Sequence, residues 1–330
     1  MQITEQPIDW PRVNLTASAA KYPQSRTNPH LPRNYMLAVV AGARGSGKTF
    51  AAVELIKQME RGQMTDPEGH ARPVRTILVS PTALANPVYD SLGSLDPDDI
   101  HLDYSDDLIH KIVDDIKKTK DDAEEYQETM KVFRKWARMR DENDLTFEEL
   151  MLLAKHGFEP PPKPKYEWPP ITNLVLDDLV GSQALRPGRS PLTYLAIRNR
   201  HHACNIMLLV QAVKQVPKVL RNNASVYMVF PFANSKMILE DLYPEVSNIL
   251  KEEEFVQLFE HATTGDDRPF LLMDFTKDKK HYFRRKFDRY LILNKGQDVK
   301  PPSGQGVRGE AQAGKDPVSG DTRDAYKGGS

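Results

Sequence analysis

Residues 42–49 constrain this chain more than any other segment. Their sequence, GARGSGKT, fits the pattern G-x-x-x-x-G-K-[ST]. Glycines in such a loop let successive backbone N–H groups point toward one anion, the lysine places its charge between phosphates, and the threonine hydroxyl is a ligand for Mg²⁺. The sequence therefore predicts a phosphate-binding loop. Lys48 is also expected to take part in catalysis, and Thr49 to bind the metal. The residues predicted to bind the nucleotide are Gly42, Ala43, Arg44, Gly45, Ser46, Gly47, Lys48, Thr49 and Phe50.

The segments beside this loop favour the same interpretation. Residues 35–40 have the pattern of a short buried strand, and residues 50–59 that of a helix. A strand followed by a glycine loop and a helix aims the N-terminus of that helix at an anion. A glycine-rich turn without a ligand is the alternative.

Composition and cysteine content exclude several classes of protein. The 330 residues include 45 Lys and Arg against 46 Asp and Glu, so the overall charge does not favour nonspecific binding to nucleic acid. The single cysteine, Cys204, cannot form an internal disulfide and agrees with a reducing compartment. With His201 and His202 it suggests a metal site only as a weak alternative. The chain has no apolar stretch of the ~20 residues that cross a bilayer, and no signal peptide, so we expect a soluble intracellular protein.

The chain divides by composition into an arm, a core and a tail. Residues 1–34 are polar and punctuated by proline, which predicts an extended N-terminal arm. Residues 35–293 predict an α/β core, and residues 294–330, rich in Gly, Pro, Ser and charge, predict a disordered tail. Four more strands are expected in the core, at residues 74–80, 172–176, 205–210 and 225–230.

Dense charge marks an insertion within this core, at about residues 95–170. Its patterns predict helices at residues 106–118, 121–140 and 146–155. Most of its charges are expected on a solvated face, with docking of a partner through Phe133 and Trp136 as the alternative. After the last strand, residues 270–275 and 282–293 predict the two arms of a hairpin.

Two acids follow the apolar strand at residues 172–176. In phosphoryl transfer to water, one carboxylate at such a strand end reaches Mg²⁺ and the next polarises the attacking water. We assign Asp177 to the metal and Asp178 to the general base.

Gln211 ends the strand at residues 205–210. In P-loop ATPases with a separate catalytic carboxylate, an extra strand lies between the P-loop strand and the strand of the acids. An amide at its tip can donate to phosphate and accept from the attacking water. Gln211 fits this catalytic position, and a surface glutamine is the alternative. The predicted fold is an α/β P-loop NTPase of the RecA/ASCE type, with a mainly parallel sheet in the strand order 5-1-4-3-2.

Arginines near these strands are candidates for an arginine finger. Such a residue neutralises charge on the transferring phosphoryl group in a neighbouring subunit. Arg200 precedes the fourth strand and Arg221 follows it, so both are named as catalytic candidates.

Taken together, the motifs resemble those of the viral genome-packaging ATPases of the FtsK/HerA-like class, found in poxvirus-like and giant-virus groupings. The resemblance spans about residues 35–232 and rests on the P-loop and Gln211, with further segments at residues 80–82, 174–178, 198–201 and 216–223. It implies ATP and Mg²⁺ as cofactors and a homo-oligomeric ring that moves double-stranded DNA into a capsid. It also implies a place in the virion or at cytoplasmic assembly sites, with a capsid vertex or a membrane-associated virion protein as a further partner. Asp178 stands where the wider class often has Glu.

A basic run near the C-terminal end of the core predicts where DNA is held. Lys and Arg contacts to phosphates grip DNA without reading its sequence. The predicted contacts are Lys279, Lys280, Arg284, Arg285 and Lys286. An edge hairpin whose cations deter aggregation is the alternative.

Other functions remain open from the sequence. A GTPase is suggested by D-x-x-G at residues 178–181, but the N-K-x-D pattern at residues 294–298 has its acid one position too late. A small-molecule kinase and a DNA helicase share the P-loop. A nucleotide-gated assembly scaffold without turnover is the non-enzymatic alternative, which the two acids and Gln211 argue against.

Overall fold

The computed structural model describes residues 22–138, 145–179, 185, 190–232, 238–265 and 267–293. The chain divides into two units, residues 1–292 and residues 293–330. Only Leu293 of the second unit is described, so the description concerns the first unit. The predicted tail and residues 1–21 of the predicted arm lie outside the described residues, and the proposed domain boundaries stay predictions.

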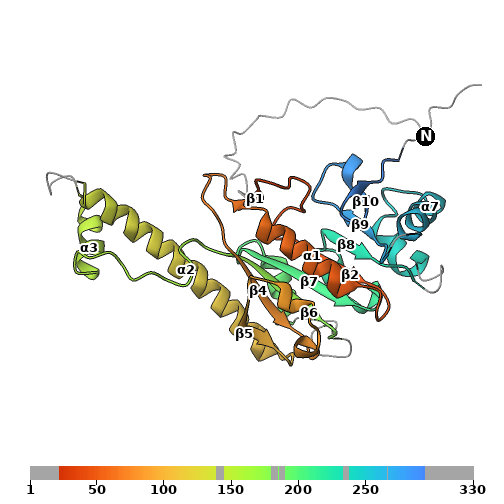
Figure 1. Cartoon of the computed structure of the whole chain (residues 1–330), viewed down its shortest axis with the longest axis horizontal. Coiled ribbons are helices and arrows are strands. Elements are labelled where there is room, and N and C mark those ends of the chain that lie inside the picture. Colours follow the sequence, from red (N-terminus) through yellow and green to blue (C-terminus); the bar gives the residue numbers. More distant parts are fainter. Residues whose placement is uncertain are drawn as a thin grey trace, which may run out of the picture. The chain divides into compact units, whose positions relative to one another are not determined.

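A nine-stranded sheet forms the centre of the first unit, in the order β11-β10-β9-β8-β2-β7-β6-β4-β5 (Figure 1). The strands from β8 to β5 are parallel, and β9, β10 and β11 extend one edge antiparallel. The five strands expected from the sequence lie in the order β8-β2-β7-β6-β4, which is fifth, first, fourth, third and second along the chain. The strands are β2 (Leu37–Ala41), β4 (Val74–Val79), β5 (Leu95–His101), β6 (Ile171–Asp177), β7 (Cys204–Val210), β8 (Val226–Val229), β9 (Leu271–Asp274), β10 (Phe283–Arg285) and β11 (Arg289–Tyr290).

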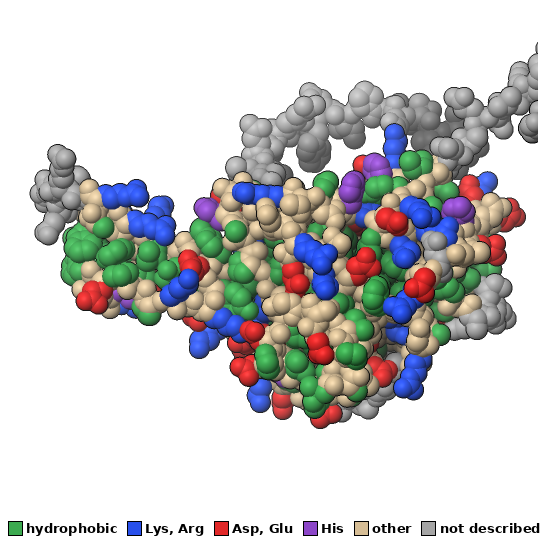
Figure 2. Space-filling model, in the orientation of Figure 1, with side chains coloured by type: hydrophobic (Ala, Val, Ile, Leu, Met, Phe, Trp, Pro, Cys, Tyr) green, Lys and Arg blue, Asp and Glu red, His purple; other side chains and the backbone are tan. Residues whose placement is uncertain are grey.

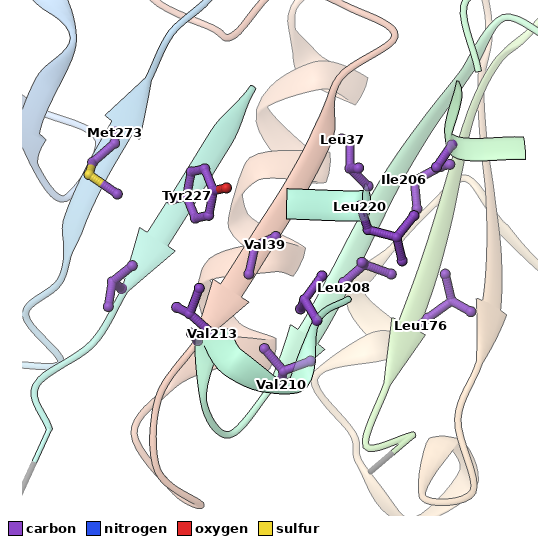
Figure 3. Packing of buried hydrophobic residues seen from close by; sticks show 14 of the residues in the cluster. Leu37, Val39, Leu176, Ile206, Leu208, Val210, Val213, Leu220, Tyr227 and Met273 are labelled. Atoms are coloured by element: carbon purple, nitrogen blue, oxygen red, sulfur yellow. The ribbon is translucent and has the colours of Figure 1, made fainter. Parts of the chain in front are cut away.

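Helices cover both faces of this sheet, so its central strands are buried throughout. Every residue of β2, β6 and β7 is buried, as expected for parallel strands that are covered on both sides. Alternate residues divide between two cores: Val40 and Leu209 pack with α1 (Lys48–Arg61), whereas Val39 and Leu208 pack on the opposite face. Figure 3 shows this second core, where Leu220 and Val213 cover side chains of β2, β7 and β8.

Two of the remaining helices begin at capping residues that can be recognised in the sequence. The long α2 (Asp106–Trp136) begins at Ser105, whose side chain accepts a hydrogen bond from the backbone of Leu108. A capping box of Thr146 and Glu149 starts α3 (Phe147–Lys155). The others are α4 (Pro191–Arg198), α5 (Lys218–Arg221), α7 (Glu252–Thr263), the short helices η1 (Ala83–Ala85), η2 (Tyr89–Ser91), η5 (Val213–Gln215), η7 (Tyr243–Glu245) and η8 (Lys279–His281), and the π-helix η6 (Ile238–Leu242).

The predicted insertion differs from the structure in two ways. Its first residues form β5, an edge strand parallel to β4, whose polar side chains hid it in the sequence. The two expected helices at residues 106–118 and 121–140 are the single helix α2, because no proline or glycine interrupts it. Phe133 and Trp136 are half-buried and pack with apolar residues of α3, and docking of a partner through them stays a prediction. The insertion is thus a pair of helices on the sheet edge, with α3 on the far end of α2 (Figure 1).

The predicted hairpin after the core is also subdivided. Its first arm is β9, but its second arm is two short strands, β10 and β11, which pair with each other across a turn. Lys286 in that turn has a left-handed φ of 53°. A separate two-stranded sheet pairs β1 (Gln24–Ser25) with β3 (Met64–Thr65).

The described part of the N-terminal arm, residues 22–34, packs against the segment that follows β9. The Lys277 ammonium donates hydrogen bonds to the backbone oxygens of Pro29 at 3.0 Å and Leu31 at 2.6 Å. Arg33 donates its backbone N–H to Thr276 Oγ1. Across the described ranges, no helix is both long enough and apolar enough to traverse a lipid bilayer.

Candidate functional site

The glycine loop joins β2 to the first turn of α1, and its backbone requires glycine at three places. Gly45 has a φ of 78° and Gly47 a φ of 104°, a region that side chains with a Cβ rarely adopt. A Cβ at Gly42 would lie 2.6 Å from Cβ of Phe230. The loop is therefore held close to β8 and open on its other side.

Lys48 is the first residue of α1 and folds back over the loop. Its Nζ donates hydrogen bonds to the backbone oxygens of Gly42 at 2.8 Å and Ala43 at 2.9 Å. Burial lowers the pKa of Lys48, while the nearby Asp177 and Asp178 raise it. The ammonium thus stands among oxygen acceptors, which the oxygens of a phosphate can replace.

Ser46, within the loop, supports the fit to an anion. Its hydroxyl oxygen is buried and has no hydrogen-bond partner among the described residues. Buried hydroxyls in native proteins are normally satisfied. A phosphate oxygen in the loop would give this hydroxyl an acceptor.

Asp177 joins two segments that lie far apart in the sequence. Its Oδ2 accepts a hydrogen bond from Thr49 Oγ1 at 3.0 Å and another from the Tyr89 hydroxyl at 2.6 Å. The side chain is buried, and burial raises its pKa, whereas the two hydrogen bonds and the charge of Lys48 lower it. A threonine hydroxyl beside a buried carboxylate is the set of oxygen donors that Mg²⁺ prefers.

Asp178 and Gln211 line the same pocket as the loop. This pocket has a volume of about 340 Å³ and is also lined by Lys48, Thr49 and Asp177. Asp178 is exposed and has a left-handed φ of 54°, an uncommon conformation that turns the chain as β6 ends. Gln211 follows β7, which pairs with β2 on one side and β6 on the other. The strand that carries Gln211 therefore lies where the sequence places it, between the loop strand and the strand of the acids.

The two arginine candidates lie away from this pocket. Arg200 comes before β7 and Arg221 comes before β8, so both lie near the N-terminal ends of these parallel strands, whereas the loop follows the C-terminal end of β2. The guanidinium of Arg200 is 6.0 Å from the Tyr22 ring centroid. The guanidinium of Arg221 forms an ion pair of 2.5 Å with Glu245 and a hydrogen bond to Val216. Neither arginine lines the pocket of its own chain, and Arg221 has a structural partner.

Two residues of the site were missed by the sequence reasoning. Tyr89 comes from η2, a short irregular segment with no motif that marks it. Arg268 lies beside the loop: its Cδ would be 2.9 Å from a Cβ at Gly47, and its guanidinium is 4.8 Å from the Phe50 ring centroid. Phe50 is 47% exposed in the structure. In the sequence, an aromatic residue in the first turn of the helix is the one signal for its contact with an arginine.

The basic run predicted to bind DNA is largely occupied by internal contacts. Arg284 is 2% exposed and pairs with buried Asp274 at 3.2 Å, so its assignment as a DNA contact is wrong. Arg285 donates to the backbone oxygen of Thr264, and Lys286 donates to that of Asp267 at 3.4 Å. Lys279 and Lys280 on η8 are exposed and stay candidates.

The weak metal alternative and the GTPase pattern find little in the structure. No group of three or more His, Cys, Asp or Glu side chains able to hold a metal occurs within the ranges the structure describes. Cys204 is buried, and burial raises its pKa to about 12, which disfavours a thiolate ligand. Residues 180–181 and 294–298, which carry parts of the GTPase patterns, lie outside the described residues.

Comparison with known proteins gives structural neighbours only. No protein-family model and no curated protein matches the chain. The chain is similar to the genome-packaging NTPase B204 from Sulfolobus turreted icosahedral virus 2 in complex with ATP-gammaS, with 13% identity and a TM-score of 0.39 over 78% of this chain and 98% of that chain. It is also similar to EssC (ATPases 2 and 3) from Geobacillus thermodenitrificans, with 15% identity and a TM-score of 0.43 over 86% of this chain and 47% of that chain. A further neighbour is the pCW3 conjugation coupling protein TcpA, with 15% identity and a TM-score of 0.36 over 80% of this chain and 65% of that chain.

Proposed function

We propose that this chain is a Mg²⁺-dependent ATPase that moves double-stranded DNA into a viral capsid as part of a homo-oligomeric ring. One observation carries the ATPase proposal: Gln211, Asp178 and Lys48, from three separate strand ends, line one pocket. A P-loop that only binds nucleotide needs neither the second acid nor the amide. Their convergence supports hydrolysis over a scaffold without turnover.

Each residue has a distinct task in this proposal. The loop amides and Lys48 would hold the phosphates, and Thr49 with Asp177 would hold the metal. When bound, ATP with Mg²⁺ supplies a γ-phosphoryl group whose transfer to water releases the energy for movement. Asp178 is exposed at the pocket, so it can take a proton from water there. The Gln211 amide can orient that water because it both donates and accepts hydrogen bonds.

The translocation part of the proposal rests on the motif resemblance described above. A ring is also supported by the position of Arg200, which is exposed near the N-terminal ends of the parallel strands, away from its own pocket. From that end of the strands it can reach a nucleotide only in the site of another subunit. Arg221 is held by Glu245 and is assigned to positioning its own helix.

The experiment measures hydrolysis of ATP and GTP with and without duplex DNA, alongside native mass with ATP. The proposal expects preference for ATP, stimulation by DNA and an ATP-dependent oligomer. Absence of phosphate release would favour the scaffold, and preference for GTP would favour the GTPase. Hydrolysis by a monomer that DNA does not stimulate would favour a small-molecule kinase or another P-loop enzyme. A helicase would separate the strands of a tailed duplex, which the proposed motor would not do.

A further inference from the structure

A second cavity lies between the C-terminal half of α2 and the segment that precedes β6. Its volume is about 770 Å³, and it is open to solvent. One wall is formed by Lys131, Arg134, Lys135 and Arg138, and the other by His70 and Trp168. We call this cavity the α2 groove. Figure 2 shows Lys and Arg side chains gathered along one side of the C-terminal half of α2.

The basic wall of the groove is formed mainly by one face of α2 and has few acidic side chains near it. Lys131 and Arg134 lie three residues apart on α2, so their side chains leave the helix on the same side, and Arg138 lines the same groove from the turn after the helix. All three are exposed and have no hydrogen-bond or ion-pair partner within the described part of the chain. Lys135 is held by Glu149 at 2.7 Å. Among the described residues that line the groove, Glu128 is the one carboxylate, so this described lining is net positive.

The opposite wall is fixed in place. Trp168 stacks on His70, with ring centroids 4.0 Å apart and an interplanar angle of 16°. Asp66 accepts from the His70 ring nitrogen at 3.1 Å. Gln127 of α2 donates to the backbone oxygen of Glu167 at 2.7 Å, which ties the two walls together. The groove is therefore a built feature rather than a gap between independent segments.

We propose that the α2 groove binds the phosphate backbone of duplex DNA. This inference rests on the proposed DNA-translocating function and names a surface for it. From Lys131 to Trp136, its last residue, α2 rises about 7.5 Å, at ~1.5 Å per residue, and Arg138 lies in the turn just beyond. A helical wall of this length, with Arg138 beyond it, passes about two to three phosphates of one strand, at ~3.4 Å of DNA axis per phosphate. Three exposed cations along this wall can contact successive phosphates, whereas Arg284 of the basic run at β10 is buried.

The test is the salt dependence of binding to a duplex of arbitrary sequence. In the triple variant Lys131→Gln, Arg134→Gln, Arg138→Gln, the slope of log affinity against log salt falls by about 2.7, because each phosphate that a cation neutralises adds ~0.9 to the slope. The matched control, Lys111→Gln, Lys117→Gln, Lys118→Gln, removes three exposed cations from the other half of α2 and keeps the slope. Basal ATPase activity without DNA stays unchanged in both variants.

The single variant Arg134→Gln guards against a folding defect, with an expected fall in slope of about 0.9. A triple variant with the slope of the parent would overturn the inference while leaving the motor proposal intact. In that case, loss of packaging in the same variant would assign the groove to a protein partner. If the parent protein does not bind duplex DNA at all, the translocase proposal fails together with the groove.

Discussion

The hydroxyl of Tyr89 lies 2.6 Å from Oδ2 of Asp177 and donates a hydrogen bond to it. This contact connects an irregular segment after β4 to the acid at the end of β6. The same oxygen accepts from Thr49, so a tyrosine holds the carboxylate that is proposed to bind the metal. Tyr89 is 2% exposed, and its position is set by the core rather than by solvent.

Replacing Tyr89 with phenylalanine should make metal-dependent activity more sensitive to acid. The Tyr89 hydrogen bond lowers the pKa of Asp177, in opposition to burial. Without it, the carboxylate takes up its proton at higher pH, so the acid limb of the kcat/KM profile moves upward. Tyr166→Phe, at a half-buried tyrosine that makes no contact with Asp177, is the control. An acid limb identical to that of the parent would remove Tyr89 from the site.

Asp177→Asn should not destabilise the protein free of nucleotide, although it abolishes metal binding. Burial raises the pKa of Asp177 above its ordinary value of 3.8, so the ionised form is unfavourable in the folded state. In the parent protein, protonated Asp177 favours the folded state. This contribution to stability is fully present below the pKa of Asp177 in the unfolded chain, and it is lost as the pH rises through the higher pKa in the folded protein. The stability of the variant relative to the parent should therefore increase from pH 4 to neutral pH. Urea unfolding at both values measures this, and a less stable variant at pH 7 would contradict it.

Much of this site could be predicted from the sequence because its parts lie at ends of buried parallel strands. The strands β2, β6 and β7 are buried over their full length and mostly apolar, and because they are parallel their C-terminal ends lie at the same side of the sheet. The loop of residues 42–49 directly follows β2, Asp177 is the last residue of β6, and Gln211 directly follows β7. Their convergence follows from the strand order, which places β7 between β2 and β6.

The parts that were missed depend on contacts through space. Arg268 and Gly47 meet only because β9 joins the sheet beside β8, and no local pattern records that pairing. The burial of Arg284 depends on the acid Asp274 of the neighbouring strand. In the sequence, Arg284 is one of several cations in a row. The strand β5 (Leu95–His101) was not predicted from the sequence, because its several acids are unusual in a strand and are tolerated only at the edge of a sheet.

Arg268→Ala should weaken nucleotide binding without altering the fold. Its side chain covers Gly47 and lies over the Phe50 ring, where it adds positive charge beside the loop. Removal of one charge-assisted interaction predicts a Kd for ATP that is about 5–30-fold higher, or ~1–2 kcal/mol. Isothermal titration measures the change, with Lys280→Ala as the control at an exposed cation. Equal affinity in Arg268→Ala and the parent would restrict this arginine to packing.

Arg284→Met should reduce stability rather than DNA affinity. The change leaves Asp274, which is fully buried, without its ion-pair partner. Breaking a buried pair in this way costs about 3–5 kcal/mol in the free energy of unfolding. Chemical denaturation provides the value, and Lys280→Met should remain within about 0.5 kcal/mol of the parent. A variant as stable as the parent but with a weaker salt dependence of DNA binding would restore Arg284 as a DNA contact.

Lys48 is proposed to hold the phosphates of a bound ATP, whereas Asp178 is proposed to take a proton from the attacking water. Single-turnover hydrolysis of ATP by Asp178→Asn, compared with nucleotide binding by the same variant, separates them directly. We expect ATP affinity within about threefold of the parent and a hydrolysis rate lower by about 10²–10⁴, whereas Lys48→Ala loses binding or turnover. Hydrolysis by Asp178→Asn at the parental rate would contradict the account, because the second acid of the pocket would then have no part in the chemistry.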